Sequence, residues 1–352
     1  MIQRTGATVQ TDSPIETVQL DKSWQQLLSE AVSEPEQLLQ RLQLPGSMQA
    51  SMQAASENFA LRVPEPFLKL IEPGNPQDPL LLQVLPQARE LDQLPGYVAD
   101  PLAEQSSNPD AGIIHKYHGR LLLVISGGCA INCRYCFRRH FPYQDNQLSG
   151  TQWQAVLDYL NEHPEVEEVI FSGGDPLATP DSRLIRLIDD LEQLPQLKRV
   201  RIHTRLPVAI PQRLTDALRQ RLSRSRLQAV MVLHLNHPNE IGDELKHWLQ
   251  PWRQSNITLL NQSVLLEGIN DRAEVLIELS ERLFAEGILP YYVHLLDPVA
   301  GAAHFDMDEQ KARQLVGAMA AKLPGYMVPK LTREQPGVSA KVQLSPDLPD
   351  KS

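Results

Sequence analysis

Short apolar runs alternate with longer amphipathic stretches through the middle of the chain. The runs that predict β-strands are residues 120–125, 169–171, 200–203, 229–233, 257–260 and 291–295. Between them, apolar residues at helical spacing predict helices near 151–161, 181–193, 211–222, 240–253, 272–286 and 307–321. Six strand-then-helix units in series indicate a parallel sheet with right-handed crossovers.

The series of units favours an α/β fold of the partial (β/α)6 barrel type, similar to a TIM barrel. No Gly-x-Gly-x-x-Gly sequence follows the first predicted strand, which argues against a dinucleotide-binding sheet. In barrels of this kind the chemistry lies at the carboxyl ends of the strands. We therefore expect the functional residues to follow the strands.

The spacing of apolar residues along the sequence predicts three regions. Residues 1–110 are expected to form a helical region, because segments 23–28 and 35–42 carry apolar residues at helical spacing. Residues 111–325 are expected to form the barrel. Residues 326–352 lose the alternation and are expected to form a proline-rich segment of strand and loop.

Composition excludes several classes of protein. There are 33 Lys and Arg against 43 Asp and Glu, a net charge of −10, which argues against a nucleic-acid partner. Even a run such as residues 121–125, which no other apolar run exceeds, is far shorter than the roughly 20 residues that span a bilayer. Residues 1–6 do not resemble a secretion signal, so we expect a cytoplasmic protein without membrane association.

Cysteine occurs at only three positions, Cys129, Cys133 and Cys136, directly after the first predicted strand. An odd, clustered set is not a disulfide framework. The spacing favours a four-iron cluster in which one iron has no protein ligand and can chelate the amino and carboxylate groups of an amino acid. The alternative is a zinc site with His140 as the fourth ligand.

The cysteine triplet resembles the signature of the radical S-adenosylmethionine (SAM) enzymes. Residues 171–176, Phe-Ser-Gly-Gly-Asp-Pro at the end of the second predicted strand, are similar to the glycine-rich motif of that superfamily. Alone, such a sequence is merely a turn. Behind the triplet, the resemblance implies that Gly173, Gly174 and Asp175 bind SAM.

Residues from about 100 to 345 resemble the lysine 2,3-aminomutase family, and most of all its short branch that serves elongation factor P. The segments that carry this resemblance are residues 115–120, 133–139, 234–240, 261–266, 294–297 and 336–341. Larger members of the family use additional C-terminal cysteines for a zinc site. This chain has no such cysteines, so we expect no zinc there.

The resemblance implies that Lys341 forms the covalent bond to pyridoxal 5′-phosphate (PLP). Lys116, Tyr117 and Arg120 match the positions that bind the phosphate of PLP. The family usually has arginine in place of Lys116, so the forked contact of a guanidinium would be replaced by the point charge of an ammonium. The glycine run of the family is replaced by residues 338–340, Val-Ser-Ala, ahead of the lysine.

For the substrate, the resemblance implies that Arg138 holds the α-carboxylate in a forked contact. Asp297 matches one of two aspartates that bind the ε-ammonium of lysine. Glu334 replaces the second aspartate, which keeps the charge and lengthens the reach.

The activity that the resemblance implies is isomerisation of L-lysine to (R)-β-lysine by an isomerase that uses a [4Fe-4S] cluster, SAM and PLP. One electron from a donor of the flavodoxin or ferredoxin type starts the reaction. The product supplies a ligase that modifies a lysine of elongation factor P. Two alternatives remain: a stand-alone catabolic lysine 2,3-aminomutase, and a zinc-stabilised binding protein without turnover.

Overall fold

A computed structural model describes residues 22–108, 112–146, 148 and 150–349. Within them, one nine-stranded sheet follows the chain order from β1 to β9. The strands are β1 Ile113–Tyr117, β2 Arg120–Ser126, β3 Glu168–Gly173, β4 Arg199–Thr204, β5 Gln228–His234, β6 Ile257–Val264, β7 Leu289–His294, β8 Lys330–Arg333 and β9 Val342–Gln343.

Strands β2 to β8 are parallel, and β1 and β9 are added antiparallel at the two edges. The six predicted strands are β2 to β7, and the partial-barrel prediction is confirmed. The sequence pattern missed β1, whose residues His115 and Lys116 are polar. A seventh parallel strand, β8, lies in the region expected to be strand and loop.

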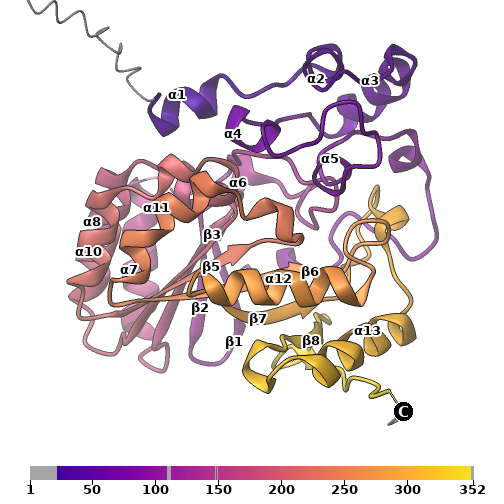
Figure 1. Ribbon diagram of the computed structural model, residues 1–352. Helices are drawn as coiled ribbons and strands as arrows, with labels where there is room; N and C mark the ends of the chain where they lie inside the picture. The colour runs from indigo at the N-terminus through magenta and orange to yellow at the C-terminus, as the bar shows by residue number, and fades with distance from the viewer. Residues whose placement is uncertain (1–21, 109–111, 147, 149, 350–352) are drawn as a thin grey trace, which may run out of the picture.

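Helices cover the outer face of the sheet, as Figure 1 shows. They are α7 Gly150–Glu162, α8 Asp181–Glu192, α10 Asp216–Ser223, α11 Asp243–Arg253, α12 Ala273–Ala285 and α13 Glu309–Lys322, with the shorter α6 Tyr143–Asn146 and α9 Leu206–Ala209 in connecting segments. Helix α10 begins later than predicted because the side chain of Thr215 caps it by accepting a hydrogen bond from the Leu218 N–H. No helix in the described ranges combines the length and apolarity needed to cross a bilayer.

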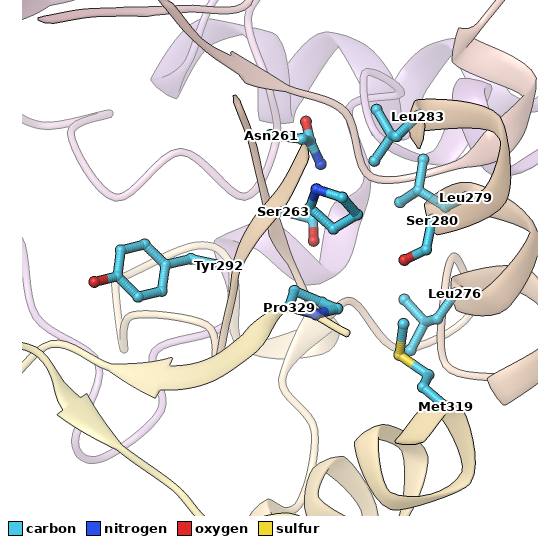
Figure 2. Close-up of a pocket in the computed structure, with 10 residues that line it drawn as sticks. Asn261, Ser263, Leu276, Leu279, Ser280, Leu283, Tyr292, Met319 and Pro329 are labelled. Atoms are coloured by element: carbon cyan, nitrogen blue, oxygen red, sulfur yellow. The ribbon is translucent and has the colours of Figure 1, made fainter. Parts of the chain in front are cut away.

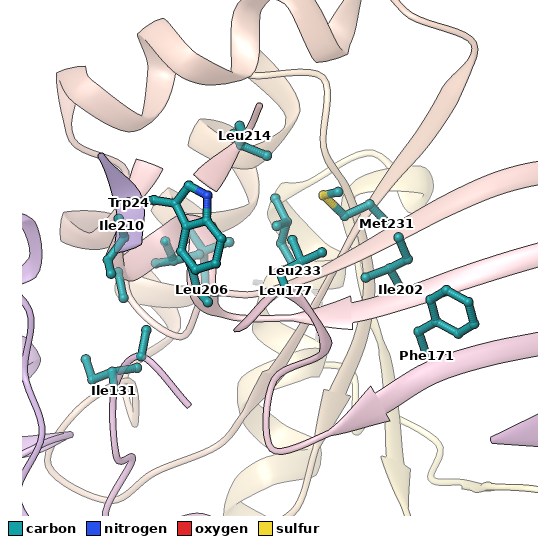
Figure 3. Packing of buried hydrophobic residues seen from close by; sticks show 14 of the residues in the cluster. Trp24, Ile131, Phe171, Leu177, Ile202, Leu206, Ile210, Leu214, Met231 and Leu233 are labelled. Carbon is teal, nitrogen blue, oxygen red and sulfur yellow. The ribbon is translucent and has the colours of Figure 1, made fainter. Parts of the chain in front are cut away.

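The N-terminal region carries α1 Trp24–Ser29, α2 Pro35–Arg41, α3 Gln49–Asn58, α4 Glu65–Leu68 and α5 Pro79–Leu82. These helices gather along one side of the barrel in Figure 1. Figure 3 shows Trp24 of α1 beside Leu206 and Ile210, which follow β4. All three side chains belong to one hydrophobic cluster that runs from the N-terminal helices through the barrel. The N-terminal and barrel regions thus share a core, and residues 109–111 at their predicted border lie outside the described residues.

A buried ion-pair network joins the N-terminal region to the cysteine loop. The carboxylate of Glu90, whose side chain is 1% exposed, accepts hydrogen bonds from Arg134 at 2.6 and 2.9 Å and from Arg139 at 2.8 Å. Removing one partner of such a group leaves an unpaired charge away from water. The N-terminal region is therefore part of the scaffold of the cysteine loop.

We expect Glu90→Gln to lower the free energy of unfolding by about 3 kcal/mol, because two buried guanidinium groups lose their counter-charge. Urea titration followed by circular dichroism measures this change. Glu278→Gln, which removes an exposed pair with Arg282 on α12, is the control and should cost less than about 1 kcal/mol. Equal losses in the two variants would contradict the role given to Glu90.

Candidate active site

The cysteine loop follows β2 and holds its three thiols half-buried. Burial raises the pKa of Cys136 to about 11, and the neighbouring Cys133 adds to the rise. Burial, Cys136 and Asp175 raise the pKa of Cys129 in the same way. Cys133 and Cys136 both act on Cys129, and Cys133 acts on Cys136, so the three thiols are near neighbours. A metal cluster bound by them would replace their protons.

The glycine-rich segment at the end of β3 packs directly on the cysteine loop. Gly173 has a φ of +120°, and a Cβ there would lie 2.4 Å from the Ser126 carbonyl oxygen. A Cβ on Gly174 would lie 2.6 Å from the carbonyl oxygen of Gly128. The Gly174 N–H donates to the Ser126 carbonyl. Only glycine permits this approach of two backbones, which brings the two predicted motifs together.

The carboxylate of Asp175 links the ends of two strands. It accepts hydrogen bonds from Thr204 Oγ1 at 2.7 Å and from the backbone N–H groups of Arg205, Leu206 and Leu177 at 2.7, 2.8 and 3.0 Å. Burial still raises the pKa of Asp175. The side chain is thus engaged by the protein, and the motif offers a ligand its backbone.

Sequence reasoning missed a polar network beneath the cysteine loop. Arg205 donates to Cys133 Sγ at 2.8 Å, to Glu240 at 2.6 Å and to Gln83 Oε1 at 2.7 Å. Gln83 comes from the N-terminal region and is fully buried. Its backbone carbonyl accepts a hydrogen bond from the backbone N–H of Arg134 at 2.9 Å. Glu240 lies in one of the segments that carry the family resemblance. Gln83 and Arg205 had no comparable sequence signal.

The predicted PLP lysine lies on the last hairpin. Strands β8 and β9 pair Thr332 with Gln343 and Arg333 with Val342, so the next residues in register, Glu334 and Lys341, face each other. Lys341 Nζ forms an ion pair with Glu334 Oε1. The Lys341 ammonium also lies 5.8 Å from the centre of the Tyr292 ring. The hairpin register therefore unites two predicted site residues that are seven positions apart.

Asp297 follows β7 and shares this space with Glu334 and Lys341. Burial and the neighbouring Glu334 carboxylate raise the pKa of Asp297 to about 7, against the attraction of Lys341 and Lys116. A carboxyl group with this pKa is poised to bind a cation, which would stabilise its ionised form.

The predicted phosphate-binding residues lie on the β1–β2 hairpin. The Arg120 guanidinium stacks over the Tyr117 ring at 4.9 Å. Burial and the Glu334 carboxylate raise the pKa of Tyr117 to about 12, and Arg120 acts in the opposite direction. Lys116 Nζ donates to the Leu102 carbonyl at 3.2 Å. The structure thus brings Lys116, Tyr117 and Arg120 to the same mouth as the C-terminal hairpin.

Arg138 is buried and already carries an ion pair. Its Nε and Nη2 atoms lie 2.7 and 2.8 Å from the two carboxylate oxygens of Glu104. Its Nη1 donates to Ser172 Oγ at 3.0 Å and to the Gly173 carbonyl at 3.2 Å. The forked contact expected for a substrate is made here to Glu104, which the sequence analysis did not single out.

Three histidines from different strands lie near Lys341 inside the barrel. Burial lowers the pKa of His203, His234 and His294, and nearby cations that include Lys341 lower it further. His234 Nε2 lies 2.8 Å from Gln262 Nε2, so the imidazole accepts this hydrogen bond. The barrel interior is thus lined by neutral rings.

The zinc alternative requires His140 as its fourth ligand. His140 Nε2 lies 3.0 Å from the Ala300 carbonyl oxygen. In the part of the chain that the structure describes, no three His, Cys, Asp or Glu side chains, the three cysteines included, are grouped closely enough to hold a single metal ion. Three neighbouring thiols beside a glycine-rich segment, and a lysine amine paired with Glu334, fit the cluster, SAM and PLP that the resemblance implies.

A small cavity elsewhere has a different character. Figure 2 shows it between β6 and the outer helices, with Leu276, Leu279 and Met319 around it and the Tyr292 hydroxyl directed away. None of the predicted site residues lines this cavity. It belongs to the packing of α12 and α13 on the sheet.

Comparison with known proteins matches the chain to one superfamily and to several relatives that share one name. The model of the radical SAM superfamily matches residues 123–251, from β2 to α11. The L-lysine 2,3-aminomutase of Haemophilus influenzae is 52% identical over 90% of this chain and 94% of that protein. The enzyme of the same name from Escherichia coli is 47% identical over 93% and 96%. That of Clostridium subterminale is 32% identical over 92% of this chain and 78% of its own length.

We expect Ala in place of any one of Cys129, Cys133 or Cys136 to remove iron from anaerobically reconstituted protein, because a cubane held by three thiolates loses an anchor. Iron and sulfide analysis measures the loss. His140→Ala is the control and should keep its iron. Zinc in the purified protein that disappears with His140→Ala would instead support the Cys3His site.

The raised pKa of Asp297 predicts how stability depends on pH. An unfolded aspartate ionises near pH 4, whereas in the fold ionisation is delayed to about 7. The folded state therefore binds more protons between these values, and its stability falls as the pH rises through them. Asp297→Asn removes this loss. The free energy of unfolding of the variant, relative to that of the parent, should therefore be about 2 kcal/mol higher at pH 8 than at pH 5.

Urea titrations of parent and variant at the two pH values measure this difference. Asp347→Asn, a change far from the mouth on the C-terminal segment, controls for the loss of one negative charge. A gain for Asp297→Asn that is the same at pH 5 and pH 8 would contradict the assigned pKa.

Proposed function

Because the chain belongs to the L-lysine 2,3-aminomutase family of the radical SAM superfamily, we propose that it isomerises L-lysine to β-lysine by moving the amino group from Cα to Cβ. The enzymes of this family are isomerases that use a [4Fe-4S] cluster, SAM and PLP. One observation carries the proposal. The mouth of the barrel that holds the three thiols also holds the guanidinium of Arg138, the carboxylates of Asp297 and Glu334, and the amine of Lys341.

When bound, the cluster and SAM supply the radical chemistry, and the aldehyde of PLP takes up the amino group that migrates. Cys129, Cys133 and Cys136 would hold the cluster. Gly173 and Gly174 would let the SAM-binding segment approach the cluster loop closely. The adjoining Asp175 would keep that segment rigid through its four hydrogen bonds to neighbouring loops.

Lys341 would hold PLP, with Lys116, Tyr117 and Arg120 around the phosphate. Glu334 supports this role because its ion pair orients the amine of Lys341 across the hairpin. Burial and Lys341 lower the pKa of His203, His234 and His294, so these rings add no positive charge beside the amine.

The substrate would lie lengthwise between opposite charges. Arg138 would meet the α-carboxylate, and Asp297 and Glu334 would bind the ε-ammonium. A molecule fixed at both ends presents Cβ in one position, and misplacement of about 1 Å costs roughly 100-fold in rate. Charge complementarity at both ends thus supports lysine as the substrate.

We further propose that the product is (R)-β-lysine, that a ligase attaches it to a lysine of elongation factor P, and that a flavodoxin or ferredoxin supplies the electron. The replacement of the family's second aspartate by Glu334 supports this branch. The rival is a stand-alone catabolic aminomutase.

Anaerobic incubation with L-lysine, SAM and a chemical reductant, followed by chiral chromatography, tests the proposal. We expect (R)-β-lysine from the parent and at least a 100-fold loss of rate in Asp297→Asn, because the ammonium loses a counter-charge at the reacting geometry. An (S) product would contradict the elongation factor P assignment. Failure to convert lysine under conditions in which SAM is cleaved would contradict the aminomutase itself.

Borohydride reduction of the PLP-loaded protein, followed by peptide mapping, should find the pyridoxyl group on Lys341, the amine that faces the predicted cofactor site. Lys330, at the start of β8 on the same hairpin, is the internal control. A label on Lys330 would contradict the assignment.

A further inference from the structure

A segment of the N-terminal region crosses the mouth of the barrel. At one end, Val98 forms a parallel bridge with Val299, two residues after Asp297. The Val98 N–H donates to the Pro298 carbonyl at 3.0 Å, and the Val98 carbonyl accepts from Ala300 at 3.0 Å. At the other end, Glu104 begins a short turn of helix and reaches into the site. Residues 98–104 therefore tie the Asp297 loop to Arg138.

Glu104 is the residue of this segment that enters the site. It is 4% exposed, and both of its carboxylate oxygens accept from Arg138, at 2.7 and 2.8 Å. Lys116 Nζ lies 3.5 Å from Glu104 Oε1. Burial acts to raise the pKa of Glu104, but the charge of Arg138 and its hydrogen bonds hold this pKa below its ordinary value. An ionised Glu104 thus joins Arg138 to Lys116.

The hydrogen bonds of Arg138 leave little for a ligand. A guanidinium has five N–H donors. Glu104 takes one from Nε and one from Nη2, and Ser172 Oγ and the Gly173 carbonyl take the two on Nη1. A single Nη2–H remains to which no described residue is bonded. A forked contact to a substrate would require Glu104 to leave a buried ion pair, which is costly.

We propose that Glu104 is a positioning residue, which stays on Arg138 when lysine binds and aims the remaining Nη2–H at the substrate carboxylate. The inference rests on the proposed function. A guanidinium held by four hydrogen bonds has no rotamer freedom left to lose on binding. Glu104 also cancels one of the two cationic charges of Arg138 and Lys116. The net charge of the trio is then +1, which matches one carboxylate.

The test is a titration of L-lysine into PLP-loaded Glu104→Gln in the presence of SAM and without reductant, followed by the absorption spectrum of PLP. Loss of the charge-assisted fork frees the guanidinium to turn, so we expect lysine to bind about tenfold more weakly than to the parent. L-Lysinamide, which lacks the carboxylate charge, should lose much less. With reductant present, the variant should form more 5′-deoxyadenosine per β-lysine than the parent.

The matched control is Glu192→Gln, which removes a Glu–Arg pair with Arg221 on the outer helices and should bind lysine as the parent does. Tighter lysine binding by Glu104→Gln would mean that Glu104 competes with the substrate for Arg138, which overturns the inference. Unchanged binding overturns it as well.

Glu104→Asp serves if Glu104→Gln does not fold. Aspartate keeps the negative charge on a side chain that is one methylene shorter. The forked contact to Arg138 is then strained, and lysine affinity should lie between those of the parent and Glu104→Gln. Parent-like affinity in this variant contradicts the inference. The two levels of the argument remain separable: a parent that converts no lysine defeats the proposed function, whereas Glu104 variants with parent-like lysine binding defeat only the role of Glu104.

Discussion

The rest of the structure depends on how the cysteine loop is held. The loop between β2 and α6 has few regular hydrogen bonds of its own, yet it must present three thiols to one space. The buried carboxylate of Glu90 binds Arg134 and Arg139 on either side of the last cysteine. Backbone hydrogen bonds from Asn132 and Arg134 to the carbonyls of Arg62 and Gln83 complete the attachment. The N-terminal region thus fixes the conformation of the cysteine loop.

The parallel sheet concentrates the remaining chemistry at one edge. Asp175 ties the end of β3 to the end of β4, and the adjacent Arg205 reaches Cys133 from there. On the opposite side, the β8–β9 hairpin brings Glu334 and Lys341 to the end of β7. The residues proposed to hold the cluster and SAM and those proposed to hold PLP therefore lie at the same end of the barrel, because all parallel strands end on the same side.

Like charges repel one another in the part of the site where the substrate ammonium is expected. Asp297 and Glu334 repel each other, and Lys341 satisfies them only in part. At the other end, Glu104 neutralises much of the charge of Arg138. The proposed substrate, with a cation at one end and a single anion at the other, would complement these charges. Preorganised charges of this kind place a flexible molecule without further rearrangement of the protein.

The sequence by itself determined the elements whose signals are local. Short apolar or β-branched runs predict β2 to β7, and the burial of these strands ranges from the full burial of β3 to the alternation of β6. The cysteine spacing, the Gly173–Gly174 pair and the segment around Lys341 could likewise be recognised in order along the chain. Most of the candidate site was predictable for this reason, and the structure gathers those residues at one mouth.

Only the tertiary structure decided which residues support them. Glu90, Glu104 and Gln83 are single polar residues in short helical turns or at a helix end. Each acts on a partner 34 or more positions away. Strand β9 has two residues and forms only because β8 offers its edge. Long-range partners of this kind have no periodicity in the sequence, because the buried space that selects them exists only once the chain has folded.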